Sequence, residues 1–312
     1  MRSFSGPDSG MEDKYVSLPF PQLEMPTSRT PIVGEVLNSQ PVTVDVGGSI
    51  SVRLYSDCRP HCLETATLQK GLVLLADGEE LIEEGVGFGV PVVIYKDEPY
   101  FSGTSQCEAI NQAHRSTLVK SFLMDTVSRK KVGEVCYVNN ELYSLFHKVF
   151  HRVYAKNSCF TPLFNKGIEI TKRLGINTDF VKVKPRGVIK VKYTCLSNSI
   201  EVEASFDQLE KEQCREIVLL NEQGASFFRR YSDSDKLSLF EGQIGAWVPI
   251  NADRASLSDA GETMTFSLTK RREANFFRGR EKIRNRYSWV GLGYSFRPTS
   301  STFRYVIELK SP

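Results

Sequence analysis

Glu222, Arg230 and Tyr231 bring a carboxylate, a guanidinium and a phenol into one short stretch of the chain. Glu222 follows the apolar run 217–220, and a carboxylate at the end of a strand could act as a general acid or base, or could hold a sugar hydroxyl. Arg230 and Tyr231 could together bind a carboxylate. The same stretch could instead be a turn with solvated charges, capped by Asp233. These residues alone leave both interpretations open.

The segment 270–286 is strongly basic, with eight Lys and Arg residues against two Glu residues. Aromatic residues lie among these charges, which is typical of a surface that binds a polyanion. Arg278 and Arg280 stand close together, and a pair of guanidinium groups suits bidentate contact with phosphate or carboxylate. The segment could equally be a solvated loop between two strands, with Arg280 paired to Glu281.

Trp289 begins a stretch in which every second residue is small. In a strand, Trp289, Gly291 and Gly293 would share one face. Such a face, nearly free of side chains beside an indole, is a shallow platform on which a sugar ring could stack on Trp289. The other interpretation is the close approach of another sheet or of a helical segment.

Glycine also alternates in the run 85–89, which invites comparison with a phosphate-binding loop. A phosphate loop needs a helix to begin directly after its glycines. The residues that follow, 90–94, have the pattern of a strand and include Pro91. We therefore exclude a dinucleotide site here and expect the glycines to lie on one face of a strand.

The residues that could bind a metal do not form a convincing set. His147 and His151 stand one helical turn apart, but they fall on the predicted solvated face of their helix. Cys58, His61 and Cys62 are close in sequence, yet no second cluster completes a tetrahedral site. We expect no metal and no cofactor.

One hairpin can be drawn in detail. Ile189, Val191, Tyr193 and Cys195 alternate with polar residues, and the pattern resumes after the turn 197–199. Pairing Cys195 with Ile200 places Tyr193 opposite Val202 on one face and Lys192 opposite Glu203 on the other. Because both faces agree on one register, this hairpin is the most firmly predicted element.

Further period-two patterns, together with short apolar runs at 72–76 and 217–220, predict strands on both sides of the middle of the chain. They cover residues 42–46, 50–54, 72–76, 86–94, 216–220, 264–268, 290–296 and 303–309. The segment 1–40 is rich in Pro, Ser and Gly and is expected to be extended or disordered. Helical spacing at 142–153 and 163–174 predicts a helical insertion at about 108–180. The fold predicted is mainly β: a large antiparallel sandwich over residues 41–312 with this insertion.

Composition sets broad limits. The chain has 312 residues and a net charge of +3, too small by itself to require a polyanion partner. Its seven cysteines are an odd, scattered set, which indicates free thiols in a reducing compartment. Neither a membrane-spanning apolar run nor a secretory signal is evident. We expect a cytoplasmic protein that does not insert into a membrane, and the oligomeric state stays open.

The two-part β arrangement resembles the super-sandwich of galactose-mutarotase-like proteins, which are associated with carbohydrates. The resemblance rests on the hairpin 188–206, the stretch 221–231 and the stretch 289–294, and it extends from about residue 42 to 309. It implies an epimerase-, lyase- or hydrolase-type activity if the chain is an enzyme. The chain departs from mutarotases, which use a histidine beside a carboxylate, because it has no histidine after His151.

The sequence therefore predicts a carbohydrate-binding or carbohydrate-modifying β-sandwich that holds an anionic sugar. Trp289 would stack on the sugar, Arg278, Arg280, Arg230 and Tyr231 would bind it, and Glu222 would be the catalytic acid or base. A non-enzymatic nucleic-acid or protein-binding module that uses 270–286 is the second hypothesis. A third is a structural subunit whose glycine-rich faces are covered by another chain.

Overall fold

The computed structural model describes residues 41–56, 68–82, 86–95, 98–112, 115–132, 135–137, 176–245, 247–283 and 287–311. The expected extended segment 1–40 and the two predicted helices at 142–153 and 163–174 lie outside these residues. So do the clusters at Cys58–Cys62 and at His147 and His151. The described part of the chain holds no helix long and apolar enough to cross a membrane.

The described residues form two antiparallel sheets. The smaller sheet has the order β1-β2-β3-β4, and its strands are β1 (Val42–Gly47), β2 (Ile50–Leu54), β3 (Val73–Ala76) and β4 (Glu79–Glu80). Positive φ angles at Asp77 and Gly78 form the tight turn between β3 and β4, as the Asp-Gly pair predicts. This sheet confirms the strands predicted from the alternating valines near the start of the described chain.

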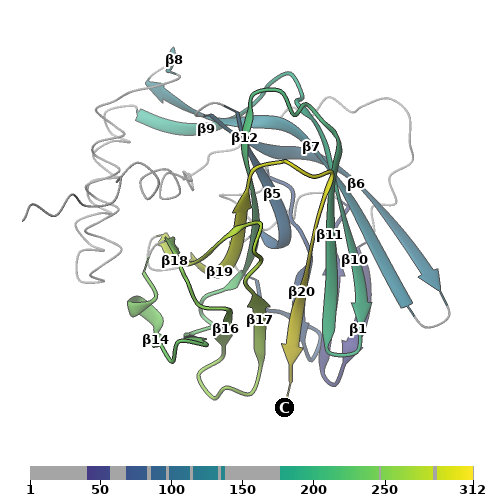
Figure 1. The fold of residues 1–312 in the computed structure, drawn as a ribbon, viewed down its shortest axis with the longest axis vertical. Coiled ribbons are helices and arrows are strands. Elements are labelled where there is room, and N and C mark those ends of the chain that lie inside the picture. The colour runs from purple at the N-terminus through teal and green to yellow at the C-terminus, as the bar shows by residue number, and fades with distance from the viewer. Residues whose placement is uncertain are drawn as a thin grey trace, which may run out of the picture.

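The larger sheet has sixteen strands, and the order along its main path is β14-β13-β16-β17-β20-β11-β10-β7-β6-β5-β12-β19-β18-β15, with β8 and β9 paired to β7 (Figure 1). Its strands are β5 (Gly87–Tyr95), β6 (Glu98–Gln112), β7 (Arg115–Val132), β8 (Val135–Tyr137), β9 (Ile176–Lys182), β10 (Gly187–Leu196), β11 (Ser199–Leu209), β12 (Cys214–Gly224), β13 (Arg230–Asp233), β14 (Ser238–Phe240), β15 (Val248–Pro249), β16 (Arg254–Ser258), β17 (Thr265–Thr269), β18 (Asn275–Ile283), β19 (Tyr287–Phe296) and β20 (Thr302–Lys310). The 3-10 turn η2 (Glu241–Gln243) follows β14.

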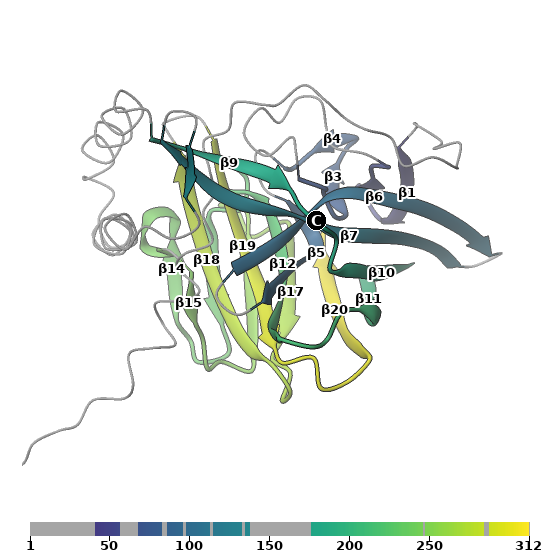
Figure 2. The ribbon, with the colours of Figure 1, turned by 90° about the horizontal axis from the view of Figure 1, so that it is seen from above.

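The large sheet folds back on itself, so that strands distant in its order face each other (Figure 2). Phe88 on β5 packs edge-to-face on Phe266 of β17, and Phe296 on β19 stacks on Phe303 of β20. We call β10, β11, β20, β17, β16, β13 and β14 the first layer, and β5, β12, β19, β18 and β15 the second layer. The faces that meet are inner faces, and the aromatic core between them makes this fold a sandwich.

The hairpin of β10 and β11 has the register that its sequence predicts. Cys195 pairs with Ile200, Tyr193 with Val202, and Lys192 with Glu203. Along β20, buried and exposed residues alternate as expected, with Phe303 and Ile307 among the buried ones. The predicted mainly antiparallel β class is therefore confirmed.

The predicted insertion at 108–180 is wrong wherever the structure describes it. Residues 108–112 end β6, residues 115–132 and 135–137 form β7 and β8, and residues 176–180 belong to β9. β6 and β7 are long partners whose turn end projects beyond the body of the sandwich (Figures 1 and 2). In the described chain, this part of the sequence links the two layers instead of inserting helices between them.

Candidate functional site

Glu222 lies within β12, and not in a solvated turn as one interpretation of the sequence held. Asn221, Glu222 and Gln223 are all fully buried. Three polar side chains in a row are stable inside a sheet only if their polar atoms find hydrogen-bond partners. Their partners come from distant parts of the chain, which explains why the local sequence did not reveal the strand.

Asn221 and Gln223 point to the inner side and tie β12 to its neighbours. Asn221 Oδ1 accepts hydrogen bonds from Gly89 N at 3.1 Å and from the Tyr305 hydroxyl at 2.8 Å. Gln223 accepts from Leu74 N and donates to Leu72 O, both at 3.3 Å. Asn221 therefore joins the two layers of the large sheet, and Gln223 joins the large sheet to the small one, so both have a structural role.

Glu222 points to the outer face of the second layer. Its Oε2 accepts a hydrogen bond from Val86 N at 3.1 Å, while its Oε1 accepts none from any residue that the structure describes. Burial raises the pKa of Glu222 to about 7, and the Val86 bond and the charge of Lys70 act in the opposite direction. A carboxyl group that exchanges its proton near neutral pH has the property needed of a general acid or base.

The floor beside Glu222 consists of glycine. Glu222 pairs with Gly291 on β19, and Gly291 pairs with Gly279 on β18, so the three lie in one row across the outer face. A Cβ on Gly279 would stand 2.5 Å from Cδ2 of Trp247, and one on Gly291 would stand 3.0 Å from its Cη2. The indole of Trp247 thus covers both glycines.

The sequence predicted that a flat ligand could lie on a platform of glycines. In the structure, the flat group on that platform is the indole of Trp247. Trp247 follows η2, on the connection between β14 and β15, and its side chain is 2 % exposed. Gly293 is covered in the same way by the ring of Phe277, which meets the Trp247 ring edge-on with centroids 5.4 Å apart. The platform exists, but it is occupied.

Trp289 does not provide the stacking surface expected of it. It lies on the same outer face as Gly291, and its side chain is fully buried. No face of this indole is open to a ligand in this conformation. A large apolar ring on a sheet is usually buried. Here the neighbouring glycines leave room for other parts of the chain to pack over the face on which Trp289 lies.

Arg278 and Arg280 lie on the opposite, inner side of β18 and do not converge with Glu222. Arg278 pairs with Leu292 and Arg280 with Val290, whereas Gly279 between them faces outward. Arg278 Nη1 donates to Ile244 O, and its guanidinium lies 4.8 Å from the centroid of the Tyr231 ring. Arg280 Nη2 donates to Ala225 O at 3.5 Å, and its backbone N donates to Gly245 O at 2.8 Å. Both arginines hold carbonyl groups of their own chain.

Arg230 and Tyr231 are also engaged within the chain. The half-exposed Arg230 guanidinium forms an ion pair with Glu262. Tyr231 is buried, and its hydroxyl donates to Asp233 Oδ2 at 2.7 Å. Asp233 Oδ1 accepts from Asp235 N and Leu237 N, so the predicted Asp233 cap is confirmed. The carboxylates that these two residues bind are internal ones.

The basic segment 270–286 is not a solvated loop along its described length. It contains β18, and Arg278 and Arg280 point inward from that strand. Arg271 and Arg272, in the turn before β18, are exposed, and Arg271 pairs with Glu273 at 3.2 Å. The two arginines expected to bind phosphate therefore lie away from the exposed ones.

The alternating glycines of β5 serve close backbone approach. Gly87 and Gly89 have positive φ angles, and a Cβ on Gly87 would stand 2.9 Å from Leu72 O. Tyr193 fills the space beside Gly89 and donates its hydroxyl to Phe88 O at 2.8 Å. Close approach of another sheet, one of the two interpretations of a glycine-striped strand, is confirmed here.

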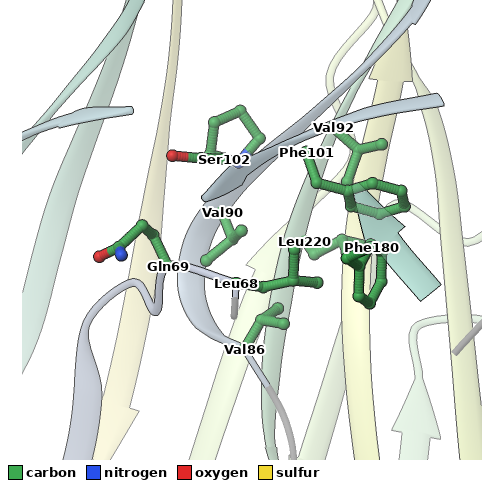
Figure 3. Close-up of a pocket in the computed structure, with 10 residues that line it drawn as sticks. Leu68, Gln69, Val86, Val90, Val92, Phe101, Ser102, Phe180 and Leu220 are labelled. Atoms are coloured by element: carbon green, nitrogen blue, oxygen red, sulfur yellow. The ribbon is translucent and has the colours of Figure 1, made fainter. Parts of the chain in front are cut away.

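A narrow apolar pocket is lined in part by Val86, the residue whose backbone N–H donates to Glu222 (Figure 3). Val86, Val90 and Leu220 form one wall, and Phe101 and Phe180 pack edge-to-face against each other on the other side, with centroids 5.1 Å apart. Its free space holds about one water molecule, so it is too small for a sugar ring as it stands.

The structure therefore brings together Glu222, Trp289 and Trp247 on the outer face, and it separates them from Arg230, Tyr231, Arg278 and Arg280. The sequence predicts Trp247, just after an apolar run, only as a core residue; its burial is confirmed, but its position over the glycines was not predicted. Gly279 is a signal that some group covers this strand, because a lone glycine in a strand indicates that another group approaches closely, but it does not say which residue that group belongs to.

No protein-family model and no curated protein matches this sequence. Among solved structures, the chain is similar to the α-N-acetylgalactosaminidase NagBb from Bifidobacterium bifidum in complex with GalNAc, at 9% identity and a TM-score of 0.43, over 86% of this chain and 35% of NagBb. It is also similar to Slr1438 from Synechocystis sp. PCC 6803, at 7% identity and a TM-score of 0.38, over 91% of this chain and 100% of that one. A third match is HI1317, at 8% identity and a TM-score of 0.34, over 87% of this chain and 99% of that one.

The chain thus spans about a third of the length of NagBb.

Proposed function

We propose that this chain is a carbohydrate-binding β-sandwich protein, and that its sugar contacts are made on the outer face of β12, β19 and β18. Glu222 is the residue that would hold a sugar hydroxyl, and it is the candidate acid or base for any bond cleavage. The observation that carries the proposal is this buried carboxyl group, with one oxygen unused by the described residues, beside a glycine floor. A pyranose has an apolar face, which a floor without side chains can accept, and hydroxyl groups at its rim, which a carboxyl group can bind.

The electrostatics of this face favour a neutral sugar. Arg278 and Arg280, the expected partners of an anionic group, point to the other side of β18 and bind carbonyl oxygens. Protonated Glu222 can donate a hydrogen bond to a hydroxyl oxygen, and ionised Glu222 can accept one, so a neutral hydroxyl suits both states. We therefore propose a neutral hexose or N-acetylhexosamine rather than a uronic acid.

Saturation-transfer NMR on the full chain tests the proposal. The panel contains methyl glycosides of neutral hexoses, of N-acetylhexosamines, including N-acetylgalactosamine, and of hexuronic acids. We expect transfer to the ring protons of a neutral glycoside, its loss in Glu222→Ala, and its survival in Glu212→Gln, which alters an exposed carboxylate. If no glycoside receives more saturation than an inert polyol, the proposal is wrong.

The second hypothesis, nucleic-acid or protein binding through 270–286, leads to a different result. A polyanion that uses Arg271 and Arg272 would bind with an affinity that falls steeply as salt rises. The inward direction of Arg278 and Arg280 gives that hypothesis little support. Fluorescence anisotropy with a labelled single-stranded oligonucleotide at two salt concentrations separates it from sugar binding.

A further inference from the structure

The indole of Trp247 is part of the buried core, and it lies flat on a part of the sheet that has no side chains of its own. It reaches the outer face from a connection outside the sheet and lies over two backbone glycines. A side chain on Gly279 would meet Cγ, Cδ2 and Cε3 of the indole within 2.8 Å. Both glycines are therefore needed for a flat ring to lie at this position.

In the described residues, the backbone of the connection that carries Trp247 has few hydrogen bonds to the second layer, although the side chains of Ile244 and Trp247 are buried. Gly245 accepts from Arg280 N at 2.8 Å, Ile244 accepts from the Arg278 side chain, and Ile250 donates to Phe276 O at 2.8 Å. β15, which follows directly, pairs with β18 through two residues only. Gly245 has a φ of 72°, a conformation open mainly to glycine. Such a segment can move without disturbing the long ladder of β18 and β19.

The indole fits the floor in shape but not in polarity. Trp247 Nε1 is buried and donates no hydrogen bond to any described residue, and Glu222 Oε1, on the same face, accepts none. Cγ of Glu222 and Cη2 of Trp247 stand 2.9 and 3.0 Å from the same point, the Cβ position of Gly291. A buried polar atom without a partner is costly, so this position suits a ring that carries hydroxyl groups better than it suits an indole.

We infer that Trp247 occupies, as an internal substitute, the position of a pyranose ring on the floor formed by Gly279 and Gly291, and that this indole must swing outward before a sugar can reach Glu222. The inference rests on the proposed sugar binding and adds the regulation of that site. The ligand class is a ring with one apolar face, to lie on the glycines, and a hydroxyl at its rim, to meet Glu222.

The first test removes the substitute. In Trp247→Ala, sugar affinity should rise, because the free energy that opens the site is no longer required. If the open form is populated at about one part in ten, the gain is about tenfold. Free indole should raise the melting temperature of Trp247→Ala, leave the unsubstituted protein unchanged, and compete with the sugar. Trp247→Phe is the matched control, because a smaller ring still covers the floor and should give a smaller gain.

A second substitution checks the floor itself. Gly279→Ala in the Trp247→Ala background meets no indole, so it should fold, yet its methyl group raises the floor. The double variant should lose both indole binding and the gain in sugar affinity. If it binds indole as well as the single variant does, the inference is wrong.

A measurement on the natural sequence avoids dependence on any folding defect. The chain has two tryptophans, so incorporation of 5-fluorotryptophan gives two fluorine signals, which Trp247→Phe assigns. Saturating sugar should move the Trp247 signal toward its solvent-exposed position. If sugar binds but this signal stays and Trp247→Ala gains no affinity, the gating inference fails while sugar binding stands. If indole rescues Trp247→Ala but no sugar binds, the covered floor is real and the proposed function fails.

Discussion

The carboxyl side chain of Glu222 and the indole of Trp247 meet over a single glycine. Both crowd the Cβ position of Gly291, which Asn221 O approaches to 2.6 Å from the neighbouring strand. The backbone of β12, the side chain of Glu222 and the indole of Trp247 thus all approach the space that a side chain at position 291 would fill. Only glycine leaves that space free.

Gly291→Ala should destabilise the protein by about 2–3 kcal/mol, because the added methyl group meets backbone as well as side chains. Asn221 O cannot move without disturbing β12. Urea unfolding provides the measurement. Gly261→Ala, in a turn with looser contacts of 3.3 Å or more, should change stability by less than about 0.5 kcal/mol. Equal effects of the two substitutions would contradict the tight contact over Gly291.

Stability should fall as pH rises from about 4.5 to 7, because the pKa of Glu222 is raised from 4.5 to about 7 in the fold. Between these values the folded state binds a proton that the unfolded state has lost, so ionisation favours unfolding. The full effect is about 3 kcal/mol, present below pH 4.5 and lost above pH 7. Glu222→Gln keeps an acceptor for Val86 N and should remove this slope, while Glu212→Gln should keep it. Parallel stability-against-pH curves for the natural protein and Glu222→Gln would refute a raised pKa.

Asn221→Ala should cost about 2–4 kcal/mol, because it leaves Gly89 N–H and the Tyr305 hydroxyl buried without their acceptor. Tyr305→Phe removes only the hydroxyl and should cost about 1 kcal/mol. The double variant should be less destabilised than the sum of the two, since the hydroxyl no longer needs a partner. A strictly additive result in denaturant unfolding would mean that the two groups are not coupled.

Arg278→Met should loosen the 244–247 connection by removing the bond to Ile244 O and the cation–π contact with Tyr231. We expect a loss of about 1–2 kcal/mol and faster amide exchange at Ile244 and Ile250. Arg272→Ala, at an exposed position, should leave exchange there unchanged. If Arg278→Met instead removes sugar binding with no change in exchange, the arginine acts on the ligand and not on the connection.

The sequence predicted best what depends on neighbouring residues. The β10–β11 register follows from a pattern that agrees on two faces, so local information was sufficient. β7 was not predicted as a strand, because Lys120 takes a buried position in its alternating pattern. The Lys120 side chain donates to Tyr55 O at 2.7 Å. A charged residue at a core position hides the alternation unless its distant partner is known.

The candidate site depends on contacts that no local pattern encodes. The sequence left open whether Glu222 ends a strand or lies in a turn, because Asn221 and Gln223 beside it are polar. The hydrogen-bond partners of these three side chains are 84 to 151 positions away. The alternation along β18 could have predicted that Gly279 faces one side of the sheet and that Arg278 and Arg280 face the other, since successive residues of a strand face opposite sides. The identity of the ring that covers Gly279 could not have been predicted from β18, because that ring comes from another part of the chain.

The two ends of the large sheet have a further consequence. β14 and β15 are three and two residues long, and β15 includes Pro249, which has no backbone N–H to offer. A sheet that ends in such short strands gives a neighbouring molecule little ladder to extend. The shortness of β15 leaves the connection that carries Trp247 with few backbone hydrogen bonds. The short strands at both ends also protect a very wide sheet from edge-to-edge aggregation.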